Sequence, residues 1–69
     1  ISARQAIKAF KKIGYLRTRQ RGSHIRLQHL DYPKRKPFTI PNHRILKIGL
    51  LQKCIKDAGL SVKEFIELL

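Results

Sequence analysis

The sequence predicts an α+β fold with the element order α-β-β-β-α-α, in which helices cover one face of a three-stranded antiparallel sheet. Two observations predict it: apolar residues recur at helical spacing near both ends of the chain, and they alternate with polar residues in the middle. Glycines and prolines mark the boundaries between these segments. A chain of 69 residues has room for one thin core, so residues 1–69 are expected to form a single domain.

The first helix is expected at residues 3–13. Ser2 and Gln5 have the spacing of a capping box, in which each side chain bonds the other residue's backbone N–H. The apolar stripe that follows consists of Ala6, Ile7, Phe10 and Ile13. Gly14 comes directly after this stripe and is expected to end the helix.

Two antiparallel strands joined by a tight turn come next. Residues 15–20 and 24–28 carry alternating patterns, and Arg21-Gly22-Ser23 between them is a turn signal. Two prolines and a basic run predict a loop at residues 31–37, followed by a short strand at residues 38–40. Because antiparallel sheets can bury one face only, the second face is expected to meet solvent.

Two helices complete the fold. Apolar residues at helical spacing predict an amphipathic helix over about residues 50–58, ending at Gly59. Ser61 and Glu64 form a second capping-box pattern, which starts a short final helix. Cys54 lies on the apolar face of the first of these helices and is expected to be a buried small hydrophobe.

Charge indicates the class of partner. The chain has 16 Lys and Arg against 4 Asp and Glu, a formal net charge of +12, which favours a polyanion. A membrane partner is disfavoured because there is no apolar run of the length that spans a bilayer. With a single cysteine and no signal-peptide pattern, the expected location is the cytoplasm.

The segment RGSHIRLQH contains the candidate site. A period of two directs His24 and Arg26 to the open face and Ile25 and Leu27 to the core. Gly22 and Ser23 allow a ligand close to the turn backbone. The cations expected beside His24 are Arg17, Arg19, Arg21 and Arg26.

An imidazole among guanidinium groups suits a phosphate ligand. Like charge disfavours imidazolium, so His24 should be neutral and able to take the proton of an RNA 2′-hydroxyl. Alternatively, His24 is an ordinary exposed residue in a cationic surface. No metal-ligand spacing surrounds His29 or His43, so both are expected to be satisfied loop or strand-end histidines, and no metal or other cofactor is predicted.

A second basic element is the run Lys34-Arg35-Lys36, which follows Tyr32. It could grip a nucleic-acid backbone while the tyrosine stacks a base. A solvated loop tip is the alternative, because runs of like charge usually are exposed and unpartnered.

Taken in order, KKIGY, RTRQRGSHIRLQH, FTIPNH and LKIGLLQKCIKDAGLSVKEFIELL closely resemble the HicA family of toxins from HicA/HicB toxin–antitoxin modules. The resemblance implies a fold like that of double-stranded RNA-binding domains and metal-independent endonucleolytic cleavage of mRNA. It assigns the catalytic histidine of a Gly-Ser-His motif to His24. It also implies a HicB antitoxin that covers the toxin's active surface.

Two other functions remain open at this stage. One is a non-catalytic RNA-binding module with the same fold, which would use charge and shape only. The other is a DNA-binding helix-turn-helix, suggested by CIKDAGLSVKEFIELL. Its second helix would carry Glu64 and Glu67 against Lys63 alone, a balance that repels phosphates.

Overall fold

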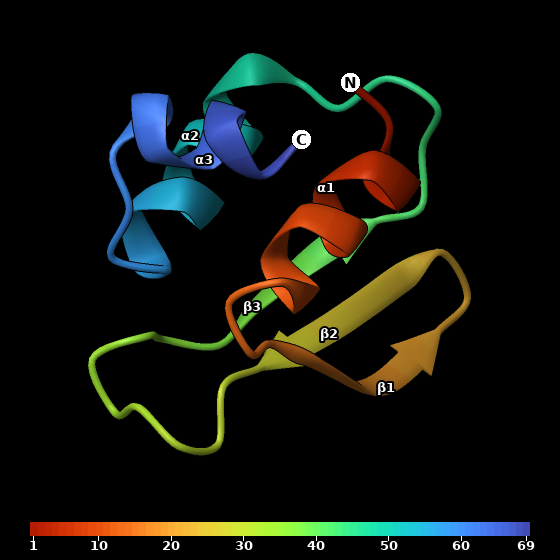
Figure 1. Ribbon diagram of the computed structural model, residues 1–69. Coiled ribbons are helices and arrows are strands. Elements are labelled where there is room, and N and C mark those ends of the chain that lie inside the picture. Colours follow the sequence, from red (N-terminus) through yellow and green to blue (C-terminus); the bar gives the residue numbers. More distant parts are fainter.

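The computed structural model describes residues 1–69 and confirms the predicted α+β fold and element order (Figure 1). Three strands pair antiparallel in the order β1-β2-β3, the helices lie on one face, and the other face is open. The arrangement is consistent with the fold of double-stranded RNA-binding domains. The elements are α1 (Ala3–Lys11), β1 (Leu16–Arg21), β2 (His24–Gln28), β3 (Phe38–Pro41), α2 (Ile48–Asp57) and α3 (Val62–Leu68).

Helix α1 has the caps that its sequence predicts. The Ser2 hydroxyl accepts from the N–H of Gln5, whose side chain accepts from the N–H of Ser2, so the capping box is complete. Regular helix ends at Lys11, two residues earlier than expected, because the last turn tightens toward Gly14 at φ +102°. The N–H of Tyr15 then reaches the carbonyl of Phe10 at 3.2 Å, a Schellman-type ending.

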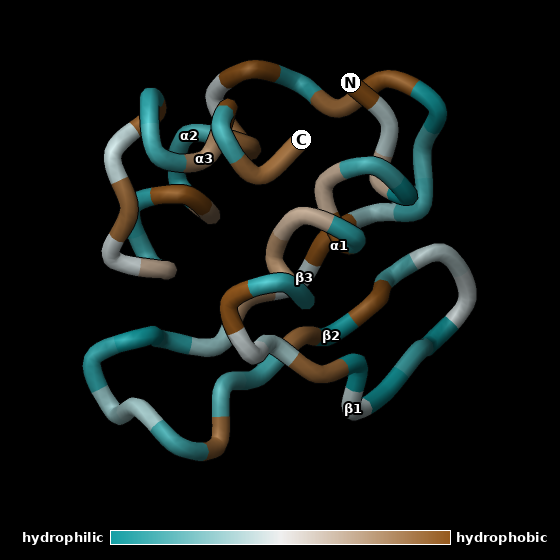
Figure 2. The backbone as a smooth tube through the Cα atoms, viewed as in Figure 1, coloured by the Kyte–Doolittle hydropathy of each residue, from teal (hydrophilic) through white to brown (hydrophobic).

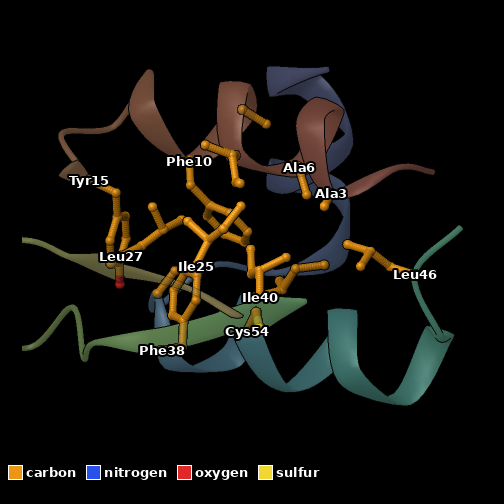
Figure 3. Close-up of a cluster of buried hydrophobic side chains, with 14 of the residues drawn as sticks. Ala3, Ala6, Phe10, Tyr15, Ile25, Leu27, Phe38, Ile40, Leu46 and Cys54 are labelled. Atoms are coloured by element: carbon orange, nitrogen blue, oxygen red, sulfur yellow. The ribbon is translucent and has the colours of Figure 1, made fainter. Parts of the chain in front are cut away.

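The core lies between the helices and the sheet, and Phe10 is at its centre (Figure 3). Its ring contacts Phe38 edge-on at a centroid distance of 4.8 Å and lies 4.9 Å from that of Phe65. Cys54 is buried here, as predicted, and burial raises the pKa of its thiol to about 11. A protonated thiol in an apolar environment is unreactive, so Cys54 contributes packing only.

His29 is a satisfied structural residue, which confirms the interpretation of its sequence context. Its Nε2 lies 2.8 Å from the carbonyl oxygen of Ile13, and its Nδ1 accepts from the N–H of Tyr32 at 3.1 Å. These partners assign the neutral ring with its proton on Nε2. The ring also packs edge-on against Tyr15, so it joins the end of α1 to the end of β2.

Helices α2 and α3 meet at a tight turn. The N–H of Leu60 reaches the carbonyl of Ile55 at 3.1 Å, and α3 begins with the predicted capping box of Ser61 and Glu64. Hydrogen bonds from the backbone and hydroxyl of Ser61 hold the pKa of Glu64 below its usual value. No helix in the chain has the length and apolar character needed to cross a membrane.

Candidate active site

The turn between β1 and β2 places His24 at the first position of its strand. Arg21 and His24 are directly paired across a two-residue loop, and Gly22 adopts φ +55°, as the first loop residue of a type II′ turn requires. The carbonyl of Ser23 accepts from the N–H of Asn42 at 2.6 Å, which ties the turn to the end of β3. The side chain of His24 is therefore exposed, while its backbone pairs with Arg21 of β1 on one side and Pro41 of β3 on the other.

Pairing across β1 and β2 gathers cations on the open face of the sheet. Arg19 lies opposite Arg26, and Arg21 lies opposite His24, so all four side chains share one face. Together with one residue of β3 they line a hollow formed by Arg19, Arg21, His24, Arg26 and Thr39. No lining residue is apolar or acidic. The hollow therefore presents a concentrated positive charge beside an imidazole.

Arg17 does not belong to this cluster, contrary to the prediction. The pairing of β1 with β2 shifts between Arg17 and Arg19, so Thr18 is an extra residue and Arg17 pairs with Leu27 on the helix-facing side. A one-residue bulge breaks the period-two alternation on which the prediction depended. Arg17 instead lines a separate hollow beside α1.

Thr39 is the site residue that sequence reasoning missed. It pairs with Arg26, and this half-buried residue lines the hollow from β3. The signal was present, because Thr39 separates the apolar residues Phe38 and Ile40 and must therefore face away from the core. Its hydroxyl adds a neutral hydrogen-bond donor to the cationic cluster.

The basic run of residues 34–36 lies away from His24. The loop begins after the last residue of β2, whereas His24 is the first residue of this strand, and the two ends of the strand are roughly 15 Å apart. Arg35 is half-buried and donates to the carbonyl of Ala58 at 2.6 Å, and its guanidinium carbon lies 5.5 Å from the centre of the Tyr32 ring. The N–H of Lys36 bonds the carbonyl of Asp57 at 2.9 Å. This loop is docked on the end of α2, whereas Lys34 remains exposed.

These contacts predict different effects for two neighbouring cations. Arg35→Ala should lower the free energy of unfolding by about 1–2 kcal/mol, because it leaves a helix-terminal carbonyl without its charged donor. Lys34→Ala, at an exposed position, should change it by less than about 0.5 kcal/mol. Urea denaturation of both variants measures the difference. Equal stability of the two would show that the bond to Ala58 contributes nothing.

His43 also lies outside the cluster. Its side chain is exposed, and its carbonyl accepts from the N–H of Ala3 at 2.9 Å, which anchors the loop after β3 to the start of α1. The structure brings together no group of three or more His, Cys, Asp or Glu that could hold a metal ion.

The cluster can hold an anion and move a proton. Guanidinium groups bind phosphate oxygens through paired hydrogen bonds, and a neutral imidazole accepts a proton from a hydroxyl. None of the chain's carboxylates lines the hollow; they are Asp31, Asp57, Glu64 and Glu67. A phosphodiester bound here would meet the histidine without a competing anion.

Comparison with known families gives one match. The family model described as the HicA toxin of bacterial toxin–antitoxin modules matches residues 3–60, which include α1, the sheet, the whole cationic cluster and α2. No curated protein and no solved structure matches the chain.

Proposed function

The chain belongs to the HicA family of bacterial toxin–antitoxin toxins, and from this premise we propose that it is an endoribonuclease that cleaves mRNA without a metal ion. The observation that carries the proposal is the exposed His24 among Arg19, Arg21 and Arg26 on the open face of the sheet. RNA supplies the one group that this arrangement needs, a 2′-hydroxyl next to a phosphate.

In the proposed reaction, His24 is the general base. Its neutral imidazole takes the proton of the 2′-hydroxyl while O2′ forms a bond to the adjacent phosphorus. The bond from phosphorus to O5′ then breaks, and the products are a 2′,3′-cyclic phosphate and a 5′-hydroxyl. The three arginines bind the phosphate and stabilise the charge that grows on its non-bridging oxygens.

The departing 5′-oxygen needs a proton, which comes from water or from the imidazolium of His24. The carboxylates are all elsewhere in the chain, so no second acid competes for this role. One group acting at both ends of the reaction predicts slow turnover, because a single imidazole must reach two oxygens.

The test is cleavage of a defined single-stranded RNA by the purified chain in EDTA, with identification of the product ends. We expect 2′,3′-cyclic phosphate and 5′-hydroxyl ends at an unchanged rate in EDTA. Detection of 5′-phosphate ends would refute the mechanism, because such ends require attack by water and not by the 2′-hydroxyl. Loss of cleavage in EDTA would also refute it, because the reaction would then need a metal ion.

A non-catalytic RNA-binding module is the second candidate, and one observation favours it. The ring of His24 makes none of the side-chain hydrogen bonds in the chain, whereas a catalytic histidine is usually oriented by a partner. RNA binding without cleavage would support this candidate. The DNA-binding alternative gains no support, because the groove between α2 and α3 is lined almost entirely by apolar residues.

A toxin of this family has an antitoxin partner, which we propose is HicB-like and covers the open face of the sheet. Carboxylates on that partner would complement the four cationic or basic side chains of the hollow, and cytoplasmic mRNA would be the substrate that it excludes.

A further inference from the structure

A second basic hollow lies on the other side of the β1–β2 hairpin. It is formed between α1 and the sheet and is lined by Arg4, Ile7, Lys8, Lys11, Arg17 and Asn42. Figure 2 shows that hydrophilic residues dominate β1, whose residues contribute to both hollows. Four of the six lining residues are cations, and no carboxylate is present.

The fold concentrates this charge through two independent features. Arg4, Lys8 and Lys11 recur at spacings of four and three on one face of α1, and the bulge in β1 turns Arg17 toward them. Like charges at these helical spacings destabilise an isolated helix by a few tenths of a kcal/mol per pair. An anionic ligand would remove this repulsion.

The two hollows are neighbours across a single strand. Arg17 and Arg19 are two residues apart on β1 and face opposite sides of the sheet. β1 is an edge strand, so no further strand blocks the route around it (Figure 1). At the hairpin end, Asn42 of the second hollow bonds the carbonyl of Ser23, the residue before His24.

We propose that the second hollow binds the phosphates of the same RNA strand whose cleaved phosphate lies beside His24, the strand passing around the edge of β1. This inference rests on the proposed function for the location of the cleaved phosphate. The lining chemistry favours a nucleic-acid strand, because four cations with no carboxylate among them attract a row of phosphates. The RNA footprint is therefore several nucleotides longer than the hollow around His24 alone would hold.

The experiment compares two triple variants with equal charge. One is Lys8→Ala, Lys11→Ala, Arg17→Ala, and its control is Lys53→Ala, Lys56→Ala, Lys63→Ala on α2 and α3. All six side chains are exposed, and each set lowers the formal net charge of +12 by three. Both sets are made in the His24→Ala chain, so that affinity for a labelled single-stranded RNA of about 12 nucleotides is measured without turnover.

The groove variant, meaning the triple variant of the second hollow, should bind this RNA tens of fold more weakly than its His24→Ala parent near physiological salt. The slope of log association constant against log salt concentration should become shallower by about 2, because each of the three lost phosphate contacts contributes about 0.7 to the slope for a single strand. The control variant should lose less than about a third of that slope, through long-range attraction alone. An RNA of about 4 nucleotides, too short to span both hollows, should bind the groove variant and the control equally.

Three outcomes would overturn the inference: equal loss in the groove variant and the control, equal loss for short and long RNA, or loss confined to duplex RNA. Failure of the proposed function has a different signature. If the unmutated chain binds RNA and does not cut it, the ribonuclease proposal fails while the affinity comparison still decides the path of the strand. If it binds no RNA, both fail.

Discussion

Replacing His24 by alanine should reduce the rate of RNA cleavage by about 10²–10⁴-fold, the usual contribution of a general base. RNA affinity should stay within a few-fold, because the three arginines that bind the phosphate remain in place. The protein should fold normally, since His24 is exposed and its backbone pairing with Arg21 and Pro41 does not depend on the side chain.

The measurement is single-turnover cleavage with the protein in excess, beside RNA affinity measured for the same preparations. His43→Ala is the matched control, because His43 is also exposed but lies outside the cationic hollow, and its contact with Ala3 is through the backbone. His43→Ala should cleave at the parent rate. If His24→Ala also cleaves at that rate, the general base is another group and the mechanism proposed here is wrong.

Replacement of Arg19, Arg21 or Arg26 should give a different result from replacement of His24. Each guanidinium both binds the phosphate and stabilises the transition state, so its loss weakens RNA binding and slows cleavage together. Separate effects on binding and rate are thus expected only at the histidine.

The fold was predictable because its signals are local. Ser2 with Gln5, and Ser61 with Glu64, encode capping boxes within four residues, and alternation around Ile25 and Leu27 identifies the buried face of β2. The same alternation placed His24 correctly on the open face, because β2 pairs regularly along its length.

The site was predicted only in part because some of its determinants are not local. The bulge at Thr18 exists only in the pairing of β1 with β2, so the sequence pattern of β1 alone placed Arg17 on the wrong face. Arg35 looked like part of a free basic run because its acceptor, the carbonyl of Ala58, is 23 residues away. Backbone acceptors have no sequence signature, so side-chain identity cannot reveal a contact of this kind.

Gly14→Ala should lower the free energy of unfolding by roughly 2–4 kcal/mol, a large share of the stability of so small a domain. Two costs add. The φ of +102° at Gly14 is rarely adopted by residues with a side chain, and an ideal Cβ would lie 2.5 Å from Nε2 of His29. That atom already bonds the carbonyl oxygen of Ile13 at 2.8 Å, so the ring cannot move aside without giving up this contact.

A double-mutant cycle separates these costs. His29→Ala alone loses the bonds to Ile13 and Tyr32, and should cost about 1–2 kcal/mol. The loss of unfolding free energy in the Gly14→Ala, His29→Ala double variant should be smaller than the sum of the two single losses by about 1 kcal/mol or more. The clash is absent in the double variant, and only the backbone strain remains. Strict additivity would mean that His29 does not limit the space at Gly14.

Gly49→Ala provides the opposite expectation in the same chain. Gly49 lies in α2, its added Cβ would meet nothing within 4 Å, and alanine is the better helix former by about 0.5–1 kcal/mol. Thermal or urea denaturation should therefore show Gly49→Ala stabilised and Gly14→Ala destabilised. If both substitutions change stability equally, the close approach of His29 to the end of α1 is not what requires glycine there. Opposite signs would establish that glycine is required at the end of α1 and not in α2, and the double-mutant cycle then divides this requirement between the positive φ of Gly14 and its close approach to His29.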